Sequence, residues 1–150
     1  MSEYSHITLV KNAVHRRDEL RHFMVIEPVG HKVVATVDGH VIAQSHKAIR
    51  VREVGHRIYN PVVYIPRGDI EQRYLSRSKR ITRCPLKGDA EYFHVEVGGQ
   101  VHSNAAWSYF KVWDFDDRLQ ELNGKVAFDS NAVACHLEKE SLYAQTGTGI

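Results

Sequence analysis

The chain has 150 residues, of which 43% are apolar and 25% are charged, and its formal net charge is +2. That length is enough for one domain with its own core, without disulfides or a structural metal. The weak charge does not indicate a nucleic-acid partner. The apolar run nearest the N-terminus, residues 7–10, is too short for a signal peptide or a membrane span, so we expect a cytoplasmic protein with no membrane association.

The first predicted element is an amphipathic helix over residues 8–24, because apolar side chains recur among charged ones at a helical spacing. A proline and a glycine shortly after it end the segment. We interpret 1–24 as an N-terminal helical extension, through which the chain could form a homodimer or dock on a partner. The main domain would then span 25–140, with a flexible tail at 141–150.

From residue 31 the pattern changes to short strands. Asp38-Gly39 and Gly98-Gly99 are dipeptides typical of two-residue hairpin turns. Turn residues recur about every 8–12 positions, which predicts a mainly β fold of two packed antiparallel sheets rather than a βαβ fold. The predicted strands are 33–37, 40–44, 48–52, 62–65, 92–97, 100–103, 125–128 and 132–137.

Three motifs in the second half of the chain mix charged, thiol and aromatic side chains: YIPRGD at 64–69, TRCPLKGDAEY at 82–92 and NAAWSY at 104–109. In this order they resemble the signature of the family called "domain of unknown function 427". The resemblance implies a β-tent-like fold, two small antiparallel sheets leaning together over a cleft, as in methionine-R-sulfoxide reductases and formaldehyde-activating glutathione lyases. It also implies that the cleft is lined by Tyr64, Arg67, Asp69, Cys84, Lys87, Tyr92, Trp107 and Tyr109.

This chain departs from the family pattern at a few positions. Leu86 stands where an aromatic residue usually follows Cys-Pro, and Gly68 replaces a residue that is often charged. Residues 110–112 lack the proline-containing turn that commonly follows the third motif. These differences affect the expected ligand preference rather than the scaffold.

The charged candidates each allow a functional and a structural interpretation. Arg67 has the planar donors that bind a carboxylate or phosphate, and Asp69 could act as a general base; alternatively the two form a surface ion pair or cap a turn. Lys87 could bind an anion or, if desolvated, transfer a proton; alternatively it is a solvated turn residue.

The remaining candidates are a thiol, an imidazole and aromatic rings. Cys84 could be a nucleophile, since nearby cations favour a thiolate, or it could be a small buried residue. His94 shares a strand face with Tyr92 and is a candidate ligand-binding residue. Trp107 and Tyr109 share another face, where Trp107 could floor a ligand site or fill the core, and Tyr109 could move protons.

The sequence predicts neither a metal nor a cofactor. It has only two cysteines, Cys84 and Cys135, and no Cys-x-x-Cys pair, so a thiolate zinc site cannot be built. From Gln72 to Gly88 there are six basic residues and no acidic one. That run is either a solvated loop or a local field that steers an anionic ligand. Only one aromatic residue lies within it, and we do not expect nucleic-acid binding.

The leading hypothesis is a cleft that binds an anionic or polar small molecule and catalyses a cofactor-independent hydrolase, lyase or isomerase reaction. Asp69, Lys87, Tyr109 and Cys84 are its catalytic candidates, and its ligand-binding candidates are Tyr64, Arg67, Tyr92, His94 and Trp107. The alternatives are a non-catalytic ligand- or protein-binding module, and thiol redox chemistry at Cys84.

Overall fold

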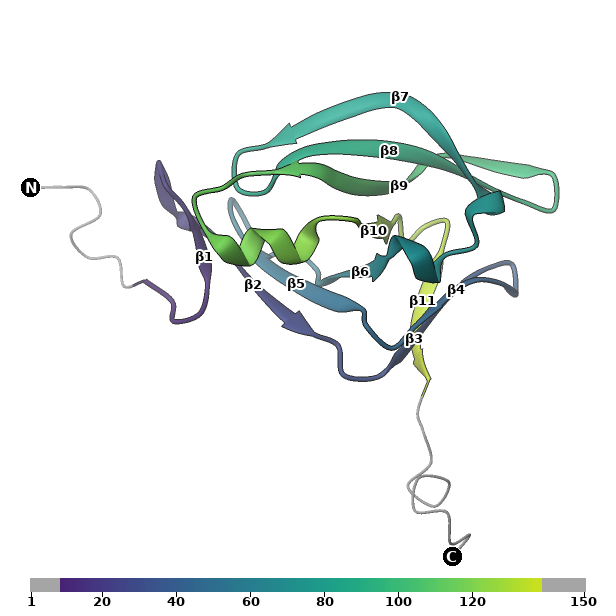
Figure 1. The fold of residues 1–150 in the computed structure, drawn as a ribbon, viewed down its shortest axis with the longest axis horizontal. Coiled ribbons are helices and arrows are strands. Elements are labelled where there is room, and N and C mark those ends of the chain that lie inside the picture. Colours follow the sequence, from purple (N-terminus) through teal and green to yellow (C-terminus); the bar gives the residue numbers. More distant parts are fainter. Residues whose placement is uncertain (1–8, 139–150) are drawn as a thin grey trace, which may run out of the picture.

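The computed structural model describes residues 9–138, and most of them lie in strands. Eight strands form one antiparallel sheet in the order β1-β2-β5-β6-β10-β9-β8-β7, and three form another in the order β11-β3-β4 (Figure 1). The strands are β1 (Val14–Arg16), β2 (Glu19–Pro28), β3 (Lys32–Val37), β4 (His40–Ser45), β5 (Ile49–Val54), β6 (Val62–Pro66), β7 (Leu75–Cys84), β8 (Gly88–Val97), β9 (Gln100–Val112), β10 (Lys125–Phe128) and β11 (Ala134–Glu138). Three short 3-10 helices, η1 (Arg67–Asp69), η2 (Gln72–Tyr74) and η3 (Asp117–Leu122), connect them.

The two sheets are linked by one long hairpin that passes from the larger sheet to the smaller. β2 pairs with β5 and β3 pairs with β4, and between these pairs the amide of Val29 donates to the carbonyl of Ala48 at 3.0 Å. At its tip Asp38 and Gly39 have φ values of 47° and 81°, the positive angles that a type I′ turn requires. The predicted hairpin around this dipeptide is confirmed, as is the mainly β fold.

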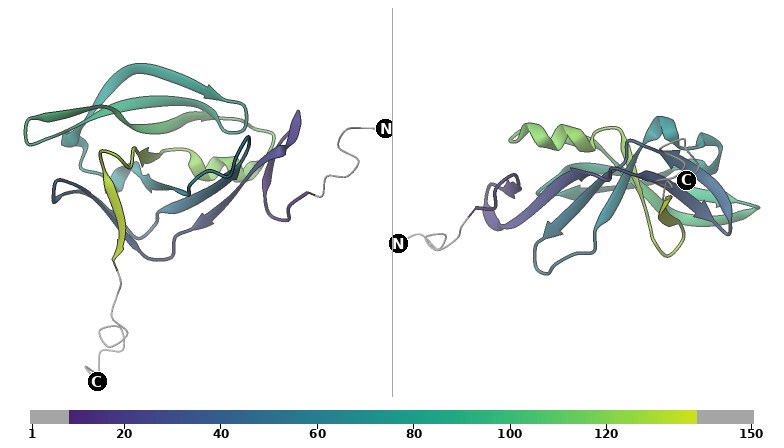
Figure 2. Two further views of the ribbon diagram at one scale, coloured as in Figure 1. Left: turned by 180° about the vertical axis from the view of Figure 1, so that it is seen from behind. Right: turned by 90° about the horizontal axis from the view of Figure 1, so that it is seen from below.

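The larger sheet has apolar residues on both faces, and each face has its own core. Strand alternation on β6 shows the division, because Ile65 packs into the core shared with the smaller sheet while Tyr64 packs into the other. We call these the first and second cores. The second core is closed by Leu119 and Leu122 of η3, both fully buried. The views in Figure 2 show the smaller sheet and η3 on different sides of the larger sheet.

The predicted helix over residues 8–24 is wrong. β1 and β2 form an antiparallel hairpin there, joined at Arg17 and Asp18, and Asn12 has a φ of 63°, which a helix does not allow. The apolar spacing fits a period of two as well, since Met24 packs into the second core. Residues 9–24 thus contain no helix that could form the expected dimer contact, and the homodimer itself stays a prediction. Residues 1–8 of the predicted extension and the predicted tail at 141–150 lie outside the described residues.

The strands predicted after residue 31 are present, but the sequence did not predict β7. This strand lies within the basic run of residues 72–88, and six of its ten residues are exposed, so no apolar alternation marks it. Among the described residues, no helix is long and apolar enough to cross a membrane.

Candidate functional site

The second core gathers most of the aromatic candidates. The β8–β9 register pairs Tyr92 with Trp107 and Ala90 with Tyr109, so these rings lie on the same face. The ring centroids of Tyr92 and Trp107 are 6.4 Å apart, as are those of Tyr64 and Tyr109. Trp107 also donates from Nε1 to the Tyr64 hydroxyl at 3.4 Å. The structure therefore brings together four residues that the sequence placed in one cleft.

Lys87 is buried at the edge of this aromatic cluster. It lies in the tight turn between β7 and β8, and only 7% of its side chain is exposed. Its ammonium lies 5.8 Å from the centre of the Tyr109 ring and donates to Oε1 of Glu53. Glu53 in turn accepts through Oε2 from Nε2 of His22 at 2.7 Å. We call these three side chains the Lys87–Glu53–His22 network.

Both charges of the buried pair are kept. Burial alone would raise the pKa of Glu53, but the ammonium of Lys87 and hydrogen bonds from Lys87 and His22 hold it below its ordinary value. Burial would lower the pKa of Lys87, yet Tyr64, Cys84 and Glu53 together raise it. Lys87 is thus a fixed ammonium, which orients Glu53 rather than accepting a proton.

The two tyrosines next to this pair are held in the neutral form. Burial raises the pKa of Tyr64 and also that of Tyr109. The hydroxyl of Tyr109 has no hydrogen-bond partner among the described residues. It is nevertheless not fully enclosed, because among those residues only Nε2 of His102 is both fully enclosed and without a partner. It can act as a hydrogen-bond donor, but not as a base near neutral pH.

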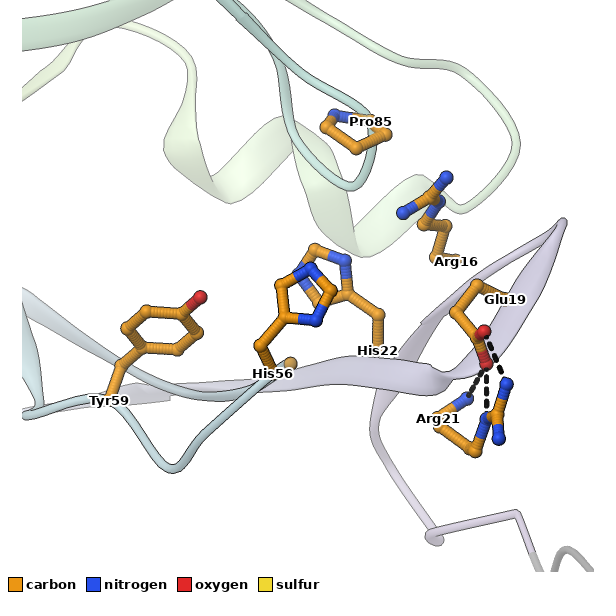
Figure 3. A pocket seen from close by; sticks show the side chains of 8 residues that line it. Arg16, Glu19, Arg21, His22, His56, Tyr59 and Pro85 are labelled. Carbon is orange, nitrogen blue, oxygen red and sulfur yellow. Dashed lines mark hydrogen bonds and ion pairs between the residues drawn. The ribbon is translucent and has the colours of Figure 1, made fainter.

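The network ends at a pocket of about 560 Å³ between the β1–β2 hairpin, the loop after β5 and the β7–β8 turn. Figure 3 shows the imidazoles of His22 and His56 projecting into this space below Pro85, with the Tyr59 hydroxyl turned toward them. Gly55 lies against His22 and Tyr59: a Cβ there would come within 3.2 Å of the Tyr59 ring. We call this the histidine pocket.

The rim of the histidine pocket carries two arginines, each already paired with a carboxylate on the same hairpin. Arg16 contacts Asp18 at 2.6 Å, and Arg21 contacts Glu19 at 2.7 Å. The hydrogen bonds from Arg21 lower the pKa of Glu19 to about 2. The rim therefore presents both signs of charge in equal number, and it suits a polar ligand.

Arg67 and Asp69 lie away from the histidine pocket. Arg67 packs over the Phe93 ring at 4.8 Å and lies 3.7 Å from Glu91, and Phe93 belongs to the first core. The carboxylate of Asp69 accepts from the buried hydroxyl of Ser45 at 2.6 Å, which ties η1 to the smaller sheet. Arg67 therefore pairs with Glu91 and not with Asp69, and Asp69 binds Ser45 and does not cap its own turn. Asp69 does line a second, shallower hollow of about 420 Å³, with Glu71 beside it.

His94 and Cys84 also have structural contacts. The Nδ1 atom of His94 accepts from the amide of Asn104 at 3.0 Å, where Asn104 has a φ of 53° at an irregular point of the β8–β9 pairing. Cys84 packs against the second core, and its carbonyl accepts from Nε1 of Trp113 at 2.8 Å. Of the two, Cys84 lies nearer the network, three residues before Lys87 in the same turn.

Sequence reasoning missed Glu53 and His22, although both left a signal. Glu53 continues the inward alternation of Ile49 and Val51, so a carboxylate stands where an apolar residue is expected. His22 precedes Met24 by two residues on β2, and β2 pairs Met24 with Glu53. Both residues are polar side chains at inward-facing positions of a strand, and that pattern identifies them. For His22 the pattern was not recognised, because residues 8–24 were interpreted as a helix.

Within residues 9–138 no group of three or more His, Cys, Asp and Glu side chains converges as metal ligands would. That the protein uses neither a metal nor a cofactor stays a prediction, because side-chain positions alone do not show what the protein binds when it functions.

Residues 25–139 match the model of a protein family described as "Domain of unknown function (DUF427)". None of the curated proteins compared with the chain matches it. The family match contains Glu53 and Lys87, whereas His22 precedes it by three residues. Because the match extends over more than half of the chain, this protein belongs to the DUF427 family.

Proposed function

We propose that the histidine pocket binds a small polar or anionic molecule, and that the protein catalyses a cofactor-independent acid–base reaction on it. The observation that carries this proposal is the Lys87–Glu53–His22 network, which runs from the second core to the wall of the pocket. A buried carboxylate and ammonium are costly to desolvate, and their contribution to stability alone is a weak reason to keep them. Their arrangement does, however, orient an imidazole at a ligand site.

His22 is the proton-transfer group in this proposal. A carboxylate that accepts from one ring nitrogen fixes the orientation and the tautomer of a histidine, as in other acid–base sites. Glu53 supplies that carboxylate, and Lys87 balances its charge without competing for the ligand. Tyr59 and His56, which line the same pocket, would hydrogen-bond a bound molecule. The resulting reaction class is a hydrolase, lyase or isomerase.

The test begins with a thermal-shift screen against polar and anionic metabolites. A ligand at one hundred times its dissociation constant should stabilise the fold by about 2.7 kcal/mol, which raises Tm by several degrees. Gly55→Val narrows the pocket against Tyr59 and His22 and should abolish the shift. Gly68→Val is the matched control, because a Cβ at Gly68 meets nothing within 4 Å. A hit that Gly55→Val retains would place the ligand elsewhere, and one that only Gly68→Val abolishes would place it in the hollow beside Asp69, which Gly68 also lines.

The same hit distinguishes an enzyme from a binding module. Turnover followed by NMR should occur with the wild-type protein and be lost in His22→Gln, while binding is retained. The exposed His46 supplies the control variant, His46→Gln, which should turn over normally. Binding without turnover in the wild type would leave a non-catalytic module.

Thiol redox chemistry at Cys84 is the third candidate. Cys135 could serve as its resolving partner, but it belongs to β11 in the smaller sheet, whereas Cys84 ends β7 in the larger one. Cys135 is exposed and lines a separate hollow of about 340 Å³, so it does not share the surroundings of Cys84. A Cys84–Cys135 disulfide detected by mass spectrometry after mild oxidation would support this candidate over the other two.

A further inference from the structure

Strand β7 is an edge of the larger sheet. Among the described residues only β8 pairs with it, and Figures 1 and 2 show nothing packed along its outer side. An edge strand has backbone donors and acceptors that are not used within the sheet, and an extended segment of another chain can pair with them.

One face of β7 carries two arginines and an isoleucine. The register pairs Arg77 with Phe93, Ile81 with Glu91 and Arg83 with Asp89, three positions two residues apart on β8, so the three β7 side chains lie on one face. The pairing of β7 with β8 is irregular between Arg77 and Ile81, so the regular part of the edge begins at Ile81. Ile81 is 59% exposed, and the side chains of Arg77 and Arg83 are 71% and 70% exposed. Each is thus accessible to a strand added at this edge.

The carboxylates beneath this face are shared between cations. Glu91 lies between Arg77, at 3.1 Å, and Arg67, at 3.7 Å, and only 12% of its side chain is exposed. One carboxylate cannot neutralise two guanidinium groups, so one positive charge is left at the surface. Glu91 therefore orients the two arginine side chains but neutralises the charge of only one of them.

The same arrangement recurs two residues away on β8. Asp89 accepts from Arg83 at 2.8 Å and faces Lys111 across the β8–β9 pair, and both cations lower its pKa, Arg83 the more strongly. The Asp89 side chain is 13% exposed. Arg83 is thus paired with Asp89. With Lys79 and Arg80, however, β7 carries four basic residues against these two carboxylates of β8, so the edge keeps a net positive charge.

The charge of this edge decides which strand can pair with it. A second copy of β7 would bring like charges together, which opposes self-association. We propose that the outer edge of β7 binds an extended acidic segment of a partner protein as an additional strand. Acidic side chains of that segment would lie beside Arg77 and Arg83, with an apolar side chain between them against Ile81. This surface is independent of the histidine pocket.

A fluorescent peptide of sequence Ser-Glu-Thr-Val-Thr-Glu-Ser, which has this pattern on one face, provides the probe. Fluorescence anisotropy should show saturable binding that weakens as salt is raised to about 0.15 M and beyond. The same peptide with lysine in place of glutamate should not bind. Hydrogen exchange on the wild-type protein should slow at residues 81–83 when the glutamate peptide is added, and this readout requires no variant.

Two substitutions at the edge should weaken binding several-fold: Arg83→Gln, which removes a charge, and Ile81→Thr, which removes the apolar contact. Val41→Thr changes an exposed apolar residue on β4, the edge of the smaller sheet, and should leave binding unchanged. Circular dichroism confirms that each variant is folded. Equal binding of the two peptides, or binding of an oligothymidylate but not of the glutamate peptide, would overturn the proposal.

Discussion

Glu53 is the residue on which the buried network depends, because it is the shared partner of Lys87 and His22. Glu53→Gln leaves the Lys87 ammonium buried without its counter-charge. We expect a loss of about 3–5 kcal/mol in the free energy of unfolding, measured by urea denaturation. Glu71→Gln, at an exposed carboxylate, is the control and should change stability little. A loss at Glu53 no larger than that of the control would show that the pair is solvated.

Removing both charges at once should be less harmful than removing one. In Glu53→Gln/Lys87→Met no uncompensated charge remains, and a long apolar side chain occupies the space of the lysine. We expect this double variant to be more stable than Glu53→Gln alone. If the double variant loses at least as much stability as the Glu53→Gln and Lys87→Met variants lose together, then Lys87 does more than balance the charge of Glu53.

The two shifted pKa values also predict how stability varies with pH. The pKa of Glu53 is below its ordinary value of 4.5, so its contribution is complete above pH 4.5 and is lost as pH falls through the folded value. The pKa of Lys87 is above its ordinary value of 10.5, so its contribution is complete below pH 10.5 and is lost as pH rises through the folded value. The stability difference between the wild type and the double variant should therefore be constant between these limits and change outside them.

At the level of single elements, the β7–β8 turn depends on one glycine. Gly88 has a φ of 136°, and a Cβ there would lie 2.1 Å from the carbonyl oxygen of Lys111 on β9. Gly88→Ala forces β8 away from β9 at this point. It should destabilise the fold by at least about 1–3 kcal/mol, measured by thermal unfolding. Because Lys87 precedes this glycine, the variant should also weaken ligand binding in the histidine pocket. Gly68→Ala, in open space, is its control.

Sequence reasoning succeeded for elements whose signal is local. The hairpins at Asp38-Gly39 and Gly98-Gly99 were predictable because their turns need two positive φ angles, and these residues supply them. It failed for β2, whose apolar positions fit a helix and a strand alike until its pairing with β5 is known. It failed for β7, because an edge strand with exposed residues on both faces has no alternation to detect.

The candidate site was predictable only in part, for the same reason. Tyr64, Tyr92, Trp107 and Tyr109 meet because strand alternation places them on one face. His22 and Glu53 come from strands that the register alone brings together. The sequence could show that a polar residue occupies an inward position, but only the pairing shows which two such residues meet.

On the scale of the whole molecule, the two cores share the strands of the larger sheet and should unfold together. Leu122→Ala empties part of the second core and should cost about 2–5 kcal/mol. Both tryptophans, Trp107 and Trp113, pack against that core, so their fluorescence reports on it, whereas far-ultraviolet circular dichroism reports on both sheets. We expect the two signals to change at the same urea concentration, in the wild type and in the variant. Separate transitions would indicate two independent units.

If the Lys87–Glu53–His22 network serves a ligand site in the histidine pocket, amide chemical shifts measured by NMR should locate the ligand there when the first hit from the screen is added. We expect the largest changes at residues 21–22, 55–59 and 85–87, which line the pocket or follow it in the same turn. Changes confined to the hollow beside Cys135 or to the one beside Asp69, with these segments unchanged, would contradict this expectation.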